Sequence, residues 1–199
     1  MNFEIRRRVR LCGRVVDLGS GENPSYWRFL QTSETELFKL DLPGIGHSDV
    51  AASLESPLPF PANTFDVALL FNVLEHVYAA GQLLAEICRI LKPGGSLYLY
   101  VPFLIQVHSA PHDYHRFTGA ALEKMFADAG FSAWEVVPLG RACVSVIGAA
   151  YPLLFSRVLR IPALAIAVLG DALLARLGER HPTWPFNCWA SGYFAHIGK

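Results

Sequence analysis

The chain has 199 residues, of which 52% are hydrophobic and 17% are charged, and its formal net charge is zero. This length is enough for one well-buried domain but not for two ordinary ones, and the composition excludes a disordered chain. A neutral chain also lacks the overall positive charge that attracts proteins to nucleic acids. We therefore expect a single domain over residues 1–199 with no nucleic-acid partner.

The cysteines are far apart in the sequence, and no Cys-x-x-Cys pair suggests a zinc site or a redox dithiol. We interpret all of them as reduced packing residues of a cytoplasmic protein. The first residues also lack the order of a secretory signal, in which charge precedes an apolar core. The cysteines are Cys12, Cys88, Cys143 and Cys188.

Residues 1–13 contain four arginines, and we expect a solvated basic leader there. The apolar run 15–18 predicts a strand, the glycines that follow predict a tight turn, and Pro24 predicts the first position of a helix. Gly19 lets the chain reverse direction, Gly21 lets a ligand approach the backbone, and the start of such a helix attracts anions. This geometry suits a nucleotide-like cofactor.

A second strand is expected over residues 36–41, and its last residue, Asp41, lies about 20 positions after Gly21. In doubly wound nucleotide-binding folds, a carboxylate at this position accepts hydrogen bonds from the ribose hydroxyls. We therefore predict that Asp41 is a ribose ligand.

The rest of the chain alternates between strand and helix patterns, with helices expected over residues 79–91 and from the Thr118 cap to Gly130. This order predicts an α/β fold with a doubly wound, mostly parallel seven-stranded sheet, its last strand antiparallel, and helices on both faces. Ligands of such sheets lie over the carboxyl ends of the strands. The further strands are expected at 49–52, 67–71, 96–101, 134–137 and 193–197.

Several segments together resemble the class I, Rossmann-like S-adenosylmethionine-dependent methyltransferases. Among these enzymes, the resemblance is to the type 11-like group, which has Leu-Pro-Phe and Leu-Glu-His motifs. Each segment is a weak signal alone, but their order and spacing over residues 14–138 are specific. Residues 111–118 look like a further signature of one subgroup. The matching segments are 15–21, 58–60, 65–67, 72–77 and 86–95.

The resemblance implies S-adenosylmethionine as cofactor, with its methionine part at the glycine turn, its ribose at Asp41 and its adenine beside Ser53 and Leu54. Relatives usually have an aspartate at the adenine, whereas this chain has Ser-Leu-Glu and an extra Pro57, so the adenine contact stays open. The missing third glycine counts against an NAD-binding site. The predicted cofactor-binding residues are Asp17, Gly19, Ser20, Gly21, Asp41, Ser53, Leu54 and Asn72.

A sulfonium methyl group is already activated, so its transfer needs mainly positioning and the exclusion of water. A general base would help an oxygen or nitrogen acceptor, and His76, His112 and His115 are the candidates, although His76 could instead hold its loop.

We expect the acceptor to contact Asp113, Tyr114 and Arg116, unless Asp113 and Arg116 pair with each other to brace their loop. His108, His112, Asp113 and His115 would suit a divalent ion, but no helix is expected to set their register, so we predict no metal.

Residues 139–190 are expected to form an apolar helical insertion that packs over the sheet or covers the substrate crevice, between the cofactor-binding core (14–138) and the last strand (191–199). Arg157 and Arg160 interrupt the apolar stretch before it reaches the about 20 residues of a membrane span. Peripheral membrane association or a dimer contact through residues 142–177 is the alternative.

The predicted function is methyl transfer to a small-molecule or glycan- or lipid-linked acceptor, at oxygen or nitrogen. The alternative is a non-catalytic Rossmann-like partner subunit that keeps cofactor binding.

Overall fold

The computed structural model describes residues 1–22, 24–44, 48–108, 112–139, 169–170 and 190–199. Seven strands form one sheet in the order β3-β2-β1-β4-β5-β7-β6, and every pair is parallel except the two that involve β7. The predicted α/β class and the antiparallel last strand are thus confirmed. The strands are β1 (Arg10–Leu18), β2 (Gln31–Asp41), β3 (Val50–Ala51), β4 (Phe65–Phe71), β5 (Leu91–Pro102), β6 (Ala133–Leu139) and β7 (Gly192–Gly198).

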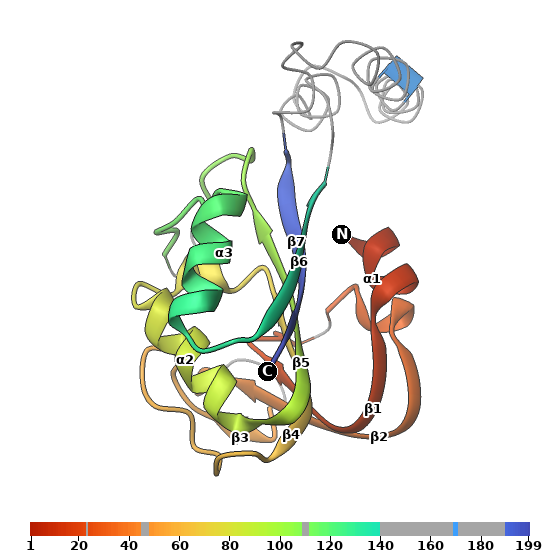
Figure 1. Cartoon of the computed structure of the whole chain (residues 1–199), viewed down its shortest axis with the longest axis vertical. Coiled ribbons are helices and arrows are strands. Elements are labelled where there is room, and N and C mark those ends of the chain that lie inside the picture. Colours follow the sequence, from red (N-terminus) through yellow and green to blue (C-terminus); the bar gives the residue numbers. More distant parts are fainter. Residues whose placement is uncertain (23, 45–47, 109–111, 140–168, 171–189) are drawn as a thin grey trace.

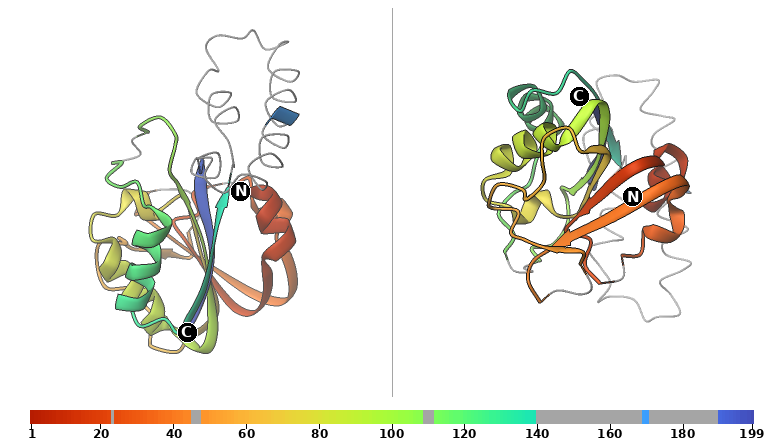
Figure 2. Two further views of the ribbon diagram at one scale, coloured as in Figure 1. Left: turned by 45° about the horizontal axis from the view of Figure 1, so that its top comes forward. Right: turned by 90° about the horizontal axis from the view of Figure 1, so that it is seen from below.

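Helices cover both faces of the sheet, as predicted (Figures 1 and 2). Helices α2 (Ala80–Ile90) and α3 (Gly119–Asp128) lie on one face, and α1 (Asn2–Arg8) lies on the other. The apolar stripe of α2, which includes Leu84 and Ile87, is fully buried in the larger hydrophobic cluster. Thr118 caps α3 as expected, because its Oγ accepts the Ala121 N–H at 3.2 Å.

The helix predicted from Pro24 does not form. Only a 3₁₀ turn, η1 (Trp27–Phe29), follows the glycine turn, and β2 begins at Gln31. Leu30 already has extended backbone angles, and the side chains of Tyr26 and Trp27 bind Asp17 beneath the turn. The predicted attraction of anions to an α-helix N-terminus at this place is therefore wrong, because no α-helix begins here.

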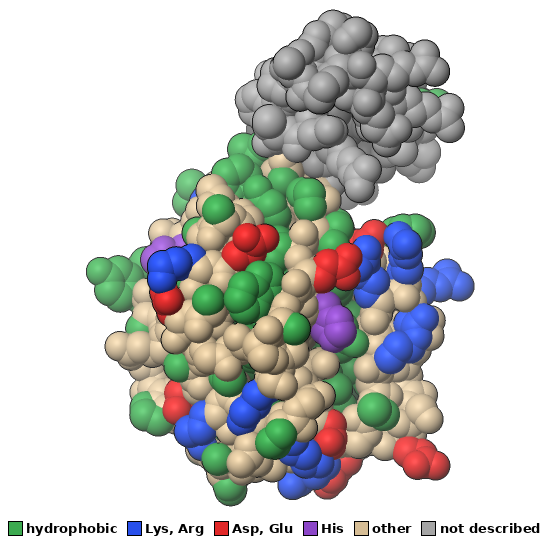
Figure 3. Space-filling view, in the orientation of Figure 1, with side chains coloured by type: hydrophobic (Ala, Val, Ile, Leu, Met, Phe, Trp, Pro, Cys, Tyr) green, Lys and Arg blue, Asp and Glu red, His purple; other side chains and the backbone are tan. Residues whose placement is uncertain are grey.

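The expected solvated leader is also wrong, because residues 2–8 form α1 and β1 already begins at Arg10. Ile5 and Val9 are one helical turn apart and fully buried in the second hydrophobic cluster, so they hold α1 against the sheet. The arginines remain outside, where Arg8 pairs with Glu4 at 2.6 Å and with Glu135 at 2.7 Å. Basic side chains accordingly gather at the right of Figure 3, next to acidic ones.

The insertion predicted over residues 139–190 lies almost wholly outside the described residues. Its two ends are described, because Leu139 pairs with Gly192 where β6 and β7 meet. Within the described parts of the chain, no helix has the length and apolar character needed to cross a membrane.

Candidate active site

A pocket of about 440 Å³ lies at the carboxyl ends of β1, β2 and β4, where the fold predicts ligand binding. Five of the predicted cofactor residues line it, and so do His76, His112 and Tyr114 from the predicted catalytic and substrate sets. The structure thus brings together residues from five segments, at or after the ends of β1 to β5. The lining residues are Gly19, Asp41, Leu42, Ser53, Leu54, Glu55, Asn72, Val73, His76, Val77, His112 and Tyr114.

The carboxylate of Asp41 is held in a fixed orientation at the end of β2. Its Oδ2 accepts the Gly21 N–H at 2.7 Å, and its Oδ1 accepts the Leu42 N–H at 2.8 Å. A carboxylate has about four acceptor sites, so two backbone donors leave capacity for further hydrogen bonds. Asp41 can therefore accept hydroxyl groups of a ligand in the pocket.

Gly19 sits where the glycine turn borders the pocket. Its φ of +72° favours glycine, and a Cβ at this position would lie 2.8 Å from Cγ2 of Val73. Of the other predicted turn residues, neither Ser20 nor Gly21 lines the pocket, and the Gly21 N–H is already bound to Asp41. The turn therefore meets the pocket only through Gly19.

Asp17 was predicted to lie beside the cofactor, but it is not among the residues that line the pocket. Its fully buried carboxylate accepts the Tyr26 hydroxyl at 2.8 Å and Trp27 Nε1–H at 2.7 Å. Burial raises the pKa of Asp17 to about 6, while these two donors act in the opposite direction. Asp17 thus supports the glycine turn from below, and sequence reasoning missed Tyr26 and Trp27 as its partners.

The Leu-Glu-His motif forms a second 3₁₀ turn, η2 (Leu74–His76), directly after β4. The carbonyl of Glu75 accepts the backbone N–H groups of Tyr114 at 2.9 Å and His115 at 3.2 Å, and His76 Nδ1 contacts the carbonyl of His112. These contacts place the loop after β5 against η2. His115 does not line the pocket, and its Nε2 lies 3.2 Å from the Tyr78 carbonyl.

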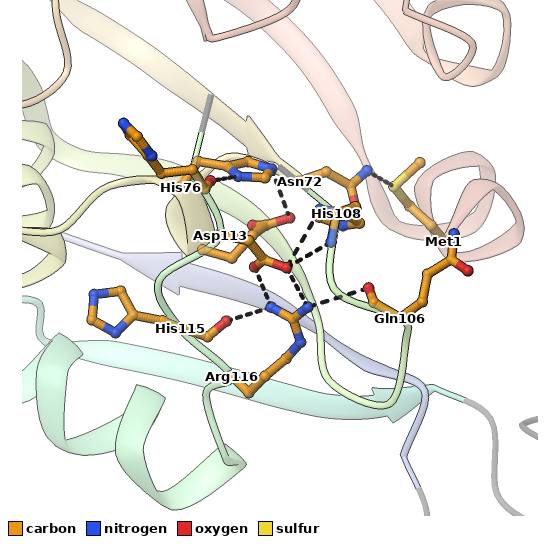
Figure 4. A network of polar contacts seen from close by, with 10 residues as sticks. Met1, Asn72, His76, Gln106, His108, Asp113, His115 and Arg116 are labelled. Carbon is orange, nitrogen blue, oxygen red and sulfur yellow. Dashed lines mark hydrogen bonds and ion pairs between the residues drawn. The ribbon is translucent and has the colours of Figure 1, made fainter. Parts of the chain in front are cut away.

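Asp113 and Arg116 pair with each other, as Figure 4 shows. Asp113 Oδ2 accepts from Arg116 Nη2 at 2.6 Å and from the His108 N–H at 2.9 Å. The guanidinium of Arg116 keeps the pKa of Asp113 well below its usual range. Neither side chain lines the pocket, so the geometry matches the bracing alternative rather than acceptor contact.

At the side predicted for adenine, Ser53, Leu54 and Glu55 all line the pocket. The Glu55 carboxylate accepts the backbone N–H groups of Tyr78 at 2.6 Å and Ala79 at 3.2 Å, next to the start of α2. As at Asp41, two backbone donors leave the Glu55 carboxylate capacity for further hydrogen bonds, so Ser53, Leu54 and Glu55 all remain candidates for the adenine contact.

Glu75 is a residue that sequence reasoning overlooked, although the Leu-Glu-His motif contains it. Its side chain is fully buried, and no donor among the described residues makes a hydrogen bond to either carboxylate oxygen. Burial raises the pKa of Glu75 to about 7. An unpartnered buried carboxylate costs free energy, so it marks a place where a group is expected to bind.

Comparison with known proteins agrees with this geometry. A family model described as a methyltransferase domain matches residues 28–99. The ubiquinone/menaquinone biosynthesis C-methyltransferase UbiE of Francisella philomiragia is 29% identical over 123 residues, which cover 50% of this chain and 49% of that protein. The chain therefore spans about half the length of the curated relatives it matches.

Solved structures share the fold at low sequence identity. The methyltransferase bound to the Haloferax volcanii Trm112 methyltransferase activator superposes with a TM-score of 0.62 at 18% identity, over 98% of this chain and 87% of that chain. A methyltransferase from Archaeoglobus fulgidus that depends on S-adenosylmethionine superposes with a TM-score of 0.60 at 13% identity, over 100% of this chain and 92% of that chain. The chain is thus similar in part of its sequence to a methyltransferase domain, and it shares the fold of class I S-adenosylmethionine-dependent methyltransferases.

Proposed function

We propose that this chain transfers the methyl group of S-adenosylmethionine to an acceptor bound beside His76, His112 and Tyr114. The observation that carries the proposal is the single pocket that joins these residues to Gly19 and Asp41. A cofactor at the glycine turn and an acceptor at the histidines would share one pocket, as in-line transfer requires. The family match and the fold support this activity.

In the proposed cofactor pose, Asp41 accepts the ribose hydroxyls and Ser53 and Leu54 border the adenine. Gly19 allows the methionine part to approach the backbone, next to Asn72. Asp17, Ser20 and Gly21 act indirectly in this pose, because they shape the turn without lining the pocket.

On the acceptor side, His112 is the candidate general base. His76 and His112 both line the pocket, but His76 Nδ1 is bound to a backbone carbonyl; His115, whose Nε2 lies against another carbonyl, does not line it. A base in reach of the acceptor contributes about 10²- to 10⁴-fold to the rate. We propose an oxygen or nitrogen acceptor on a small molecule or on a glycan- or lipid-linked group.

The UbiE relatives are named as C-methyltransferases, which makes carbon a further accepting atom to test. Tyr78 and Tyr114 stack edge to face, with ring centroids 5.4 Å apart, and Tyr114 lines the pocket. These rings would suit an aromatic or other planar acceptor.

A second candidate is a partner subunit that binds the cofactor without catalysis. The Haloferax structure supports a protein partner for a chain of this fold, although there the protein of this fold is itself the methyltransferase and its partner is the activator. The two candidates differ in turnover, because only the enzyme converts S-adenosylmethionine to S-adenosylhomocysteine when an acceptor is present.

The cellular setting is also a proposal. We propose a cytoplasmic protein that contacts a membrane surface or a second copy through residues 142–177. The support is the apolar composition of that segment, which lies outside the described residues except for 169–170.

The test is calorimetric titration of the purified chain with S-adenosylmethionine and S-adenosylhomocysteine. Asp41→Asn removes the charge but keeps the shape, and we expect it to weaken binding about 10- to 100-fold, since hydrogen bonds to a charged group contribute about 1.5–3 kcal/mol. Asp128→Asn, at an exposed ion pair with Lys124, is the matched control and should bind like the wild type.

If neither compound binds below about millimolar, the proposed function is wrong. If Asp41→Asn binds as tightly as the wild type, the ribose assignment is wrong while the function stands.

A further inference from the structure

Three potential metal ligands converge next to the pocket, within 4.8 Å of one another: an oxygen of Glu75 and one ring nitrogen each of His76 and His108. Glu75 and His76 come from η2, and His108 comes from the loop after β5. The carboxylate of Glu75 is fully buried, and no group of the described residues donates a hydrogen bond to it. The side-chain nitrogen Nε2 of His76 lies 3.7 Å from Oε1 of Glu75.

The ring of His76 is oriented as a metal ligand would be. Its Nδ1 contacts the backbone carbonyl of His112, and because a carbonyl only accepts, the hydrogen of a neutral ring must lie on Nδ1. The lone pair is then on Nε2, which lies 3.7 Å from Oε1 of Glu75. Two acceptors thus face each other, an arrangement that a bound cation would stabilise.

The third ligand, His108, is fixed by the ion pair described above. Its backbone N–H donates to Asp113, and Asp113 is held by Arg116. The rings of His76 and His108 are 5.1 Å apart between centroids, and Figure 4 shows both beside Asp113. Asp113 and Arg116 therefore have a positioning role, because they place the His108 ring opposite η2.

We propose that Glu75, His76 and His108 bind a divalent transition-metal ion. Two imidazoles and one carboxylate form a ligand set that suits zinc and related ions. Ligands about 2.1 Å from a tetrahedral ion are about 3.4 Å apart, close to the 3.7 Å between Glu75 and His76. Small side-chain rotations would bring the third ligand into range.

Three protein ligands leave a coordination position open, and His76 lines the pocket, so the open position faces the acceptor side. An acceptor oxygen bound there would lose its proton more readily. This role rests on the proposed function, whereas metal binding itself does not. The proposal reverses the prediction of a metal-free site, which considered His108 with other loop residues but not Glu75.

The experiment uses the full chain, stripped with a chelator and then titrated with Zn²⁺, Mn²⁺ or Co²⁺ by calorimetry, with bound metal counted by elemental analysis. We expect one ion per chain with a dissociation constant at or below micromolar, and a higher melting temperature on binding. Glu75→Gln and His108→Asn should each weaken binding at least 10-fold. His115→Asn, whose ring lies on the same loop but outside the three ligands, should bind like the wild type.

Failure of the wild type to bind any of these ions stoichiometrically would overturn the proposal, and so would equal losses in His108→Asn and His115→Asn. Where a variant does not fold, the Co²⁺ absorption spectrum of the wild type decides instead, because a four-coordinate nitrogen and oxygen site gives an intense visible band and a hydrated ion does not. S-adenosylmethionine binding, measured on the same samples, separates failure of the metal site from failure of the proposed function.

Discussion

At the scale of single residues, the carboxylate of Asp17 depends on two aromatic donors beneath the glycine turn. Its pKa is about 6 in the folded protein, against an ordinary value of 3.8. Between about pH 4 and pH 6, the carboxyl group of Asp17 is therefore ionised in the unfolded chain but protonated in the folded protein. The contribution of Asp17 to the free energy of unfolding falls as pH rises through this window, and it is constant above it.

Tyr26→Phe tests this interpretation. Above pH 6 the Tyr26 hydroxyl donates to a charged acceptor, and its loss should lower the free energy of unfolding by about 1.5–3 kcal/mol. At pH 5, where Asp17 is protonated, the loss should be smaller, about 1 kcal/mol. Urea unfolding at pH 5 and pH 8 measures both values.

Tyr78→Phe is the control for this comparison, because Tyr78 is 71% exposed and the change should stay within about 0.5 kcal/mol. A loss for Tyr26→Phe that is equal at the two pH values would show that the hydroxyl does not act through the charge of Asp17.

The residues of the site differ in how far the sequence could predict them. Asp41 was predicted from its separation from Gly21 along the sequence. This works because the second parallel strand ends at the same edge of the sheet as the first, next to the glycine turn. The surroundings of Asp17 and Glu75 could not be found this way, because they depend on which side chains cover each carboxylate. Spacing along the chain thus predicts at which edge of the sheet a residue lies, but not which side chains surround it.

At the scale of elements, the turn after β1 was predicted correctly while the helix after it was not. Pro24 and the apolar residues behind it fit a helix locally, but Tyr26 and Trp27 bind Asp17 instead, and β2 starts at once. Tertiary hydrogen bonds here outweigh helix propensity, which amounts to less than about 1 kcal/mol per residue.

The two glycines of this turn allow a matched comparison. Both have positive φ, +72° at Gly19 and +68° at Gly21, so alanine at either position should cost about 1–2 kcal/mol of stability. A Cβ at Gly19 would meet Val73 at 2.8 Å next to the pocket, whereas a Cβ at Gly21 would have no atom of the described residues within 4 Å. Gly19→Ala should therefore weaken S-adenosylmethionine binding more than 10-fold, and Gly21→Ala less than about threefold, by calorimetry.

Equal weakening in the two variants would contradict this reasoning, because it would mean that Gly21 also contacts the cofactor. Equal stability losses without any change in cofactor binding would instead place the cofactor away from the turn.

At the scale of the whole molecule, β7 joins the edge strand β6 to the rest of the sheet, because it lies between β5 and β6 and pairs with both. The chain leaves the sheet after Leu139 and returns at Ser191, whose N–H donates to the Leu139 carbonyl at 2.7 Å. The two ends of the apolar insertion therefore lie side by side, where the antiparallel strands β6 and β7 are paired. The sequence predicted an apolar insertion between the last two strands, packing over the sheet or covering the crevice, but it could not show that the ends of this segment meet.

This geometry predicts that residues 140–190 can be replaced by a short turn containing Asn-Gly, since such turns join adjacent antiparallel strands. The shortened chain should fold and bind S-adenosylmethionine within about threefold of the full chain, because the described residues that line the pocket all lie between Gly19 and Tyr114. If residues 142–177 contact a membrane, only the full chain should float with liposomes. An insoluble shortened chain would instead mean that the segment is part of the core, since the pairing of β6 with β7 does not depend on the residues removed.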